Sequence, residues 1–206
     1  MLPPRYLCGE RGMTDEKVHN YAFRKALGYV KSKKGRLESD RLKALFEDAT
    51  NQRIAMMPPF LPSYYPLETF VTLLKLIEEH FGEENRLMQR RESKRSYEIG
   101  YYLYSGQEEE TSPYHHLNPH KKIDEVVNEF YANLRTPSGL LKNCNITVEK
   151  EGNVIRVTWR DLSVDPIFLE YLEGLHAGMI KASTSDASMS TKKLDGAIEF
   201  DIEILG

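Results

Sequence analysis

The last third of the chain carries the clearest alternation of hydrophobic and polar positions. Residues 146–149 and 155–160 alternate on either side of a turn at Gly152-Asn153. Residues 198–204 alternate in the same way, and a partner strand is expected over residues 187–192. Alternation with a period of two is typical of strands that bury one face. The pattern therefore predicts two antiparallel hairpins that form a four-stranded sheet.

A helix is predicted between the two hairpins, with Asp165 as its N-cap and Pro166 as its first residue. Its apolar positions recur at helical spacing and form one stripe: Phe168, Tyr171, Leu172, Leu175 and Met179. Gly174 and Gly178 would let another backbone approach closely; we expect the sheet there, although a wedged ligand would need the same space. His176 is expected at the surface or at the sheet edge.

The upstream two thirds of the chain is predicted to be helical. Apolar residues recur with helical spacing over about residues 14–30, 39–50, 66–82, 83–104 and 121–134. Thr14 is expected to cap the first of these helices. The fold class is therefore α+β: an N-terminal helical half packed on a C-terminal four-stranded antiparallel sheet with the order ββαββ.

The pattern favours one domain. We expect residues 1–13, rich in proline and glycine, to be a mobile lead-in and residues 14–206 to form a single α+β domain. Within it, residues 14–139 make up the helical part and residues 143–206 the sheet part.

Composition narrows the class of protein. With 206 residues, 40% hydrophobic and 29% charged, the chain has the make-up of a soluble globular protein. A net charge of -3 gives no sign of nucleic-acid binding, and the acidic face of residues 199–203 is expected to be exposed and to repel phosphate. Cys8 and Cys144 make no disulfide framework. The chain shows no signal peptide and no apolar run of membrane-spanning length, so we expect a cytoplasmic protein.

Candidate chemistry is sparse. His115, His116 and His120 are the metal candidates, but a zinc site needs three or four convergent ligands, so a solvent-exposed loop is favoured. No nucleophile motif and no phosphate-binding glycine loop is present. We therefore expect no enzyme activity, no metal and no cofactor.

Two segments are candidates for contact with a partner. Residues 56–66 combine prolines and aromatic residues, which suits a rigid crossing anchored in the core or a recognition segment that includes Tyr64 and Tyr65. Arg135 follows the most amphipathic helix, where it either favours the helix dipole or grips a ligand carboxylate or a protein partner.

Four short motifs, in order along the chain, resemble a bacterial family of unknown function that is best populated in myxobacteria. They are Ala-Leu-Gly at 26–28, Tyr-Pro-Leu-Glu-Thr-Phe at 65–70, Asn-Leu-Arg-Thr at 133–136, and the proline-led helix that begins at Asp165 and runs past Gly174. That family is related in fold to haem-nitric-oxide-binding sensor domains, to 4-vinyl-reductase-type ligand domains and to lipid-tunnel subunits of a Golgi tethering complex.

The resemblance implies a fold that encloses an apolar ligand or serves as a regulatory partner. Haem sensors carry their iron-binding histidine on the helix that corresponds to residues 121–134, which contains none here. Their Tyr-x-Ser-x-Arg motif is also missing, since the matching hairpin reads Val-Thr-Trp-Arg at 157–160. The cysteine cluster of the vinyl-reductase-type domains is absent, and Pro-Ser-Gly at 137–139 replaces a Gly-Asn-Asn turn. We therefore expect no haem.

These observations lead to one hypothesis and one alternative. The hypothesis is a non-enzymatic sensory, regulatory or adaptor domain that acts by protein contact, with gating by an apolar small molecule left open. The alternative is a carrier with an acyl chain or lipid held permanently in an internal tunnel. A homodimer also stays open. The candidate binding residues are Arg135, Thr136, Tyr64, Tyr65, Phe168, Gly174 and Gly178.

Overall fold

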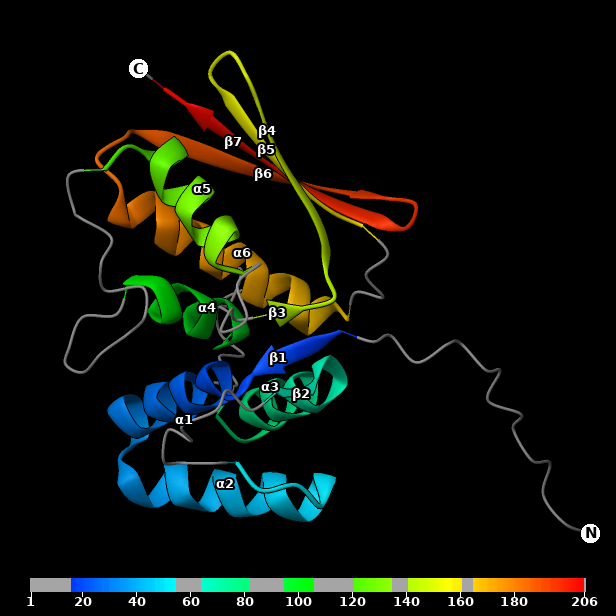
Figure 1. Ribbon diagram of the computed structural model, residues 1–206. Coiled ribbons are helices and arrows are strands. Elements are labelled where there is room, and N and C mark those ends of the chain that lie inside the picture. Colours follow the sequence, from blue (N-terminus) through cyan, green and yellow to red (C-terminus); the bar gives the residue numbers. More distant parts are fainter. Residues whose placement is uncertain are drawn as a thin grey trace, which may run out of the picture.

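The computed structural model describes residues 16–54, 64–81, 95–105, 121–134, 141–160 and 165–205. Its helices are α1 (Asn20–Lys34), α2 (Arg36–Thr50), α3 (Leu67–Phe81), α4 (Arg95–Ser105), α5 (Ile123–Leu134) and α6 (Pro166–Ala182). Its strands are β1 (Lys17–His19), β2 (Tyr64–Pro66), β3 (Leu141–Lys142), β4 (Asn145–Glu151), β5 (Val154–Arg160), β6 (Ala187–Leu194) and β7 (Ala197–Ile204). The predicted α+β class is confirmed: α1, α2 and α3 lie at one end of the molecule and a four-stranded sheet at the other (Figure 1).

The four-stranded sheet has the order β4-β5-β7-β6 and is antiparallel throughout. Gly152 and Gly196 make its two hairpin turns at φ values of 61° and 67°, which glycine adopts without steric strain. Together with α6, which joins the hairpins, this is the predicted ββαββ order. The inward-facing residues of the two central strands are buried: Ile155, Val157, Trp159, Ile198, Phe200 and Ile202.

The outward face of the sheet is polar but less open than expected. Asp201 bonds to Arg156 at 2.8 Å and to Lys192 at 2.5 Å across the strands. The side chains of Asp201 and Glu199 are only 13% and 15% exposed. The expectation of an open acidic face is therefore wrong for these two residues, because neighbouring cations cover and neutralise them; Glu203 is exposed.

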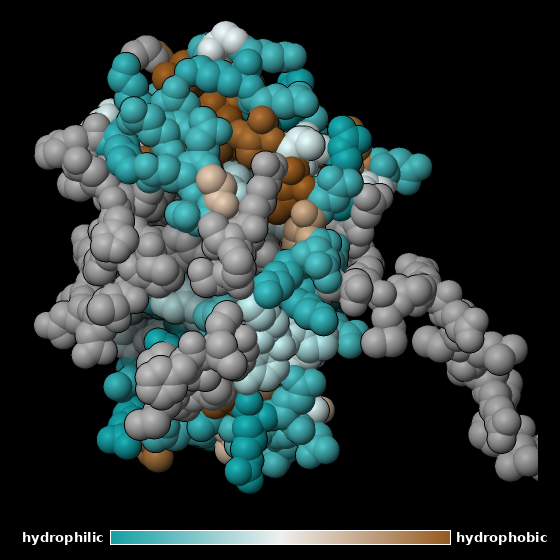
Figure 2. All heavy atoms as spheres, in the orientation of Figure 1, coloured by the Kyte–Doolittle hydropathy of each residue, from teal (hydrophilic) through white to brown (hydrophobic). Residues whose placement is uncertain are grey.

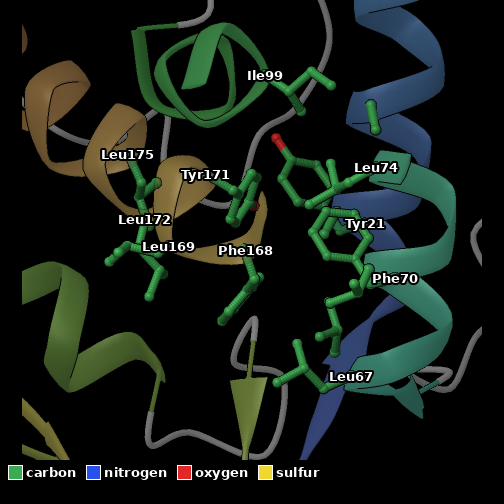
Figure 3. Packing of buried hydrophobic residues seen from close by; sticks show 14 of the residues in the cluster. Tyr21, Leu67, Phe70, Leu74, Ile99, Phe168, Leu169, Tyr171, Leu172 and Leu175 are labelled. Carbon is green, nitrogen blue, oxygen red and sulfur yellow. The ribbon is translucent and has the colours of Figure 1, made fainter. Parts of the chain in front are cut away.

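Helix α6 lies at the centre of the molecule, between the sheet and the N-terminal helices (Figure 1). As predicted, Asp165 caps it by accepting a hydrogen bond from the Ile167 amide at 3.0 Å. Tyr171 lies on the side of α6 that faces α3 (Figure 3), and its ring meets the Phe70 ring edge to face at 5.1 Å. Phe168 stacks on Tyr171 with ring centres 5.7 Å apart. One helix thus joins both halves of the fold into a continuous hydrophobic core.

Helices α4 and α6 pack backbone to backbone. A Cβ atom at Gly174 would overlap the Tyr97 carbonyl of α4, and a Cβ atom at Gly100 would overlap the Tyr171 carbonyl of α6. The expectation that the sheet is the close neighbour of Gly174 is therefore wrong. Two glycines, one on each helix, remove the side chains that would hold the helix axes apart.

A second, small sheet was not expected from the sequence. Its order is β2-β1-β3, and β1 pairs with both β2 and β3 in antiparallel fashion. The prediction that the first helix starts near residue 14 is wrong, because residues 17–19 pair with strands far away in the sequence. Helix α1 instead starts after His19, whose Nδ1 accepts a hydrogen bond from the Tyr21 amide at 3.1 Å. The expected lead-in and Thr14 lie outside the described residues.

The fourth predicted helix is only partly described. Of the helix expected over residues 83–104, the described part is α4, and residues 82–94 lie outside the description. Within the described ranges, no helix combines the length and the hydropathy that crossing a bilayer requires.

Candidate functional site

Three buried aromatic residues with polar atoms form a hydrogen-bonded chain inside the protein. His176 of α6, Trp159 of β5 and Tyr131 of α5 are 0%, 1% and 2% exposed. The Trp159 indole N–H donates to the Tyr131 hydroxyl oxygen at 3.4 Å. The Tyr131 hydroxyl lies 2.5 Å from His176 Nε2, and His176 Nδ1 lies 2.7 Å from the carbonyl oxygen of Leu172.

The partners of His176 determine its tautomer. A backbone carbonyl can only accept a hydrogen bond, so Nδ1 must carry the imidazole proton and donate it to Leu172. Nε2 is then the acceptor, and the Tyr131 O–H donates to it. Every polar atom in the chain from Trp159 to Leu172 has a partner, so these groups are buried without the penalty of an unmade hydrogen bond.

Burial also sets the charge of these groups. Removal from water lowers the pKa of His176 to about 4, with the Leu172 carbonyl opposing this shift. Burial likewise raises the pKa of Tyr131 well above its ordinary value. At neutral pH the chain therefore consists of a neutral imidazole and a neutral phenol.

The chain ties four elements together. The His176 ring stacks on Phe200 of β7 with ring centres 4.2 Å apart and an interplanar angle of 22°. The rings of Tyr131 and Trp159 meet edge to face at 6.1 Å. Helices α5 and α6 are thereby joined to each other and to the two central strands of the sheet, β5 and β7.

Polar bonds also hold the N-terminal end of α5. The Ile123 amide donates to the Ser185 hydroxyl at 3.1 Å, so the loop after α6 caps this helix. The Thr184 amide donates to the Lys121 carbonyl at 3.0 Å. Asp124 pairs with Lys150 of β4 at 2.7 Å, and this bond holds the pKa of the carboxyl group below its usual value.

The binding residues expected from the sequence do not form one site. Phe168, Gly174 and Gly178 are buried along α6. Tyr64 and Tyr65 lie in β2 of the small sheet, so the described candidates fall into two groups. Arg135, Thr136 and the three histidines His115, His116 and His120 lie outside the described residues.

The two tyrosines of β2 differ in role. Tyr65 packs against Phe23 with ring centres 4.9 Å apart, and its hydroxyl donates to the Arg53 carbonyl at 2.9 Å. Tyr64 is partly exposed on the other side of the strand, against the Lys142 ammonium and the His19 ring. The interpretation of this stretch as a core anchor thus fits Tyr65, whereas Tyr64 is only partly buried.

Sequence reasoning missed the buried chain. His176 was expected at the surface, but it follows Phe168 and Leu172 at intervals of four residues and therefore lies on the same buried stripe. The helical spacing of Tyr131 and the strand alternation of Trp159 also placed those two residues inward. What the sequence could not show is that the polar atoms of Trp159 and His176, 28 and 45 residues away from Tyr131, both meet the Tyr131 hydroxyl.

The described residues do not fit a haem. Helix α5, where the resemblance would put an iron-binding histidine, has none, and Tyr131 of this helix shares its hydroxyl with Trp159 and His176. His176 itself has both ring nitrogens engaged by protein groups, which leaves neither for iron. Within the described ranges, no group of three or more histidine, cysteine, aspartate or glutamate residues could hold a metal ion.

No protein-family model matches the chain, and no curated protein is similar to it in sequence. Solved structures do match over almost its whole length. The Fe(II) unliganded H-NOX protein from K. algicida has a TM-score of 0.61 at 16% identity, covering 91% of this chain and 97% of that chain. A mutant of the same protein gives a TM-score of 0.62 at the same identity and coverage.

The H-NOX protein from S. oneidensis in its Fe(II)NO ligation state has a TM-score of 0.54 at 10% identity, covering 91% of this chain and 99% of that chain. Identities this low establish the fold alone. The protein therefore has the fold of haem-nitric-oxide-binding domains, with a hydrogen-bonded chain of histidine, tyrosine and tryptophan in its interior.

Proposed function

We propose that this protein is a non-enzymatic sensory or regulatory domain that binds no haem and acts through contact with a protein partner. The H-NOX-like fold supports the regulatory part of this proposal by analogy. The observation that carries the haem-free part is the His176–Tyr131 bond at 2.5 Å, because it uses the ring nitrogen that an iron ligand would need.

The burial of the hydrogen-bonded residues Trp159, Tyr131 and His176 argues against catalysis. Among the described residues, His176 and Tyr131 are the pair that most resembles a catalytic acid and base. Their exposed fractions are only 0% and 2%. A substrate cannot come within hydrogen-bond reach of groups enclosed in this way. The buried histidine and tyrosine therefore offer no reachable catalytic pair, which supports a role through surface contact.

A partner-capture experiment with a point variant tests this function. Arg135, outside the described residues, remains the strongest sequence candidate for gripping a partner anion. Loss of a charge-assisted hydrogen bond costs about 1.5–3 kcal/mol, which is roughly a tenfold or larger loss in affinity. We expect Arg135→Ala to capture at least about tenfold less of the partner from host lysate at an unchanged Tm.

Arg36→Ala is the matched control, since Arg36 is a highly exposed arginine on α2 whose ion pair with Asp40 spans one helical turn. This variant should capture the partner as well as the natural protein does. The proposal fails if no protein is retained above an unrelated bait, or if both arginine variants behave alike.

One observation favours the alternative of an acyl-chain carrier. Figure 2 shows a band of hydrophobic residues at the surface in the upper part of the molecule, where α5 lies beside the sheet. Ile146 and Val148 of the edge strand β4 are only partly buried. Mass spectrometry of an organic extract of the purified protein separates the two functions: lipid recovered in equimolar amount would favour the carrier.

A further inference from the structure

The small sheet gathers positive charge on one face. In β1, Lys17 and His19 point to the side opposite to buried Val18. Lys17 is the cross-strand partner of Lys142, and His19 is the partner of Tyr64, so these four side chains share one face. We call these residues, together with Arg24 of α1, the basic face.

The distances within the basic face show that its members interact. The Lys142 ammonium lies 3.9 Å from the centre of the Tyr64 ring, and the His19 ring meets the same ring edge to face at 5.1 Å. Arg24 and Lys142 both help to lower the pKa of His19, after the larger effect of burial. Two cations thus lie close enough for their fields to act on one imidazole.

No acidic side chain among the described residues forms an ion pair with Lys17, Arg24 or Lys142. The adjacent acid, Glu16, is 6% exposed and lies on the opposite side of β1 with Val18. The basic face therefore carries three formal positive charges in a chain whose net charge is -3. Lys17 is exposed and the other members are partly exposed, so a partner can reach them.

The strand register makes this arrangement unfavourable for the isolated protein. Lys17 and Lys142 lie directly opposite each other on paired strands, a placement in which like charges destabilise a sheet. Local conflicts of this kind are expected mainly at functional sites. An anion between the two ammonium groups would relieve this one.

We propose that the basic face is a docking surface for an acidic segment of a partner protein, with Lys17, Lys142 and Arg24 pairing with carboxylates and Tyr64 packing against the segment. This inference rests on the proposed function and specifies the partner's chemistry. Carboxylates match the charge, and the partly exposed ring of Tyr64 offers an amphipathic contact of the kind enriched at protein interfaces.

Fluorescence anisotropy with a labelled decapeptide of glutamate and aspartate tests the inference. The full chain is titrated at about 0.05 M salt, where screening is weak. We expect binding that weakens as salt is added, and a loss of affinity of tenfold or more in the double variant Lys17→Glu/Lys142→Glu. Lys142→Arg should bind as the natural protein does. The control Lys181→Glu/Lys193→Glu makes the same change of charge at exposed lysines of α6 and β6.

The single variant Lys17→Glu separates docking from folding. It replaces a like-charge pair by an opposite-charge pair with Lys142, so its Tm should equal or exceed that of the natural protein while its peptide affinity falls. Equal affinity loss in the control variant, unchanged affinity in the double variant, or tighter binding of a DNA duplex than of the peptide would overturn the inference. Partner capture that depends on Arg135 but not on Lys17 and Lys142 would leave the proposed function standing and remove this surface from it.

Discussion

At the residue scale, His176 shows how a titratable group can sit in a core without charge. Its two nitrogens have one donor and one acceptor as partners, and the Phe200 ring covers its face. Satisfied polar groups in the interior specify which elements meet, because any other packing would leave them unpaired. The hydrogen bonds among Trp159, Tyr131 and His176 thus fix the position of α5 on α6 and on the sheet.

The depressed pKa of His176 predicts a loss of stability in mild acid. The unfolded chain takes up a proton near the ordinary value of 6.5, whereas the folded protein resists protonation until about 4. Stability from this group is complete above pH 6.5 and falls as the pH drops toward 4, by about 3 kcal/mol in total. Urea unfolding between pH 4.5 and 7.5, at about 25 °C, measures this loss.

His176→Phe is the reference for that measurement. The pKa of His19 is also lowered, by burial and by its cationic neighbours, so it contributes in the same window in both proteins. The natural protein should lose about 2–3 kcal/mol more than the variant across the window. Equal pH dependence in the two proteins would show that His176 is not a buried neutral imidazole.

A double-mutant cycle tests the Tyr131–His176 bond itself. Tyr131→Phe leaves His176 Nε2 and the Trp159 N–H without their partner, and His176→Phe leaves the Tyr131 proton without an acceptor. Each single change should cost about 1–3 kcal/mol. The double variant removes the orphaned imidazole nitrogen and the orphaned hydroxyl together, while the Trp159 N–H stays unpaired as in Tyr131→Phe. It should therefore be more stable than the sum of the single effects predicts, by about 0.5 kcal/mol or more. Additive effects would mean that the two side chains do not interact.

At the scale of elements, the contact between α4 and α6 depends on the absence of two side chains. Gly100 and Gly174 each face a backbone carbonyl of the other helix. Close approach lets α4 cover α6 on the side away from the sheet, so α6 is enclosed on both sides (Figure 1). A pair of glycines on separate helices is therefore a structural requirement of this fold and not a ligand gap.

Gly174→Ala should destabilise the protein by about 1–3 kcal/mol, because the added methyl group would overlap the Tyr97 carbonyl and push α4 away. Gly28→Ala is the matched control. A Cβ atom at this α1 position meets nothing within 4 Å, so the gain in helix propensity should leave stability unchanged or raise it by up to about 1 kcal/mol. Equal effects in urea unfolding would contradict the close packing of α4 on α6.

At the scale of the whole molecule, the sequence predicted what depends on local pattern. The ββαββ unit followed from alternation, from Asp165 with Pro166 and from the helical stripe, and these are confirmed. The small sheet could not be predicted, since β1 is three residues long and exists through pairing with residues near 65 and 141. The partner of Gly174 and the burial of His176 were misjudged for the same reason: both depend on elements distant in the sequence.

For the candidate site, too, the sequence predicted only what depends on local pattern. The sequence argued against haem by what α5 lacks, whereas the structural argument, the hydrogen bonds that occupy Tyr131 and His176, needed three elements in their places. The basic face likewise appeared only when the strand register brought Lys17 and Lys142 together. Groups of residues that are distant in the sequence can be recognised only in the folded structure, because the hydrophobic pattern does not show which elements meet.

Titration with hemin tests the central claim most directly, with the K. algicida H-NOX protein loaded in parallel as the positive control. Because both nitrogens of His176 and the Tyr131 hydroxyl are engaged, we expect this protein to keep no Soret band at about 400 nm after desalting, while the control keeps one. A stoichiometric band that survives desalting, and that disappears in His176→Phe or Tyr131→Phe, would contradict it.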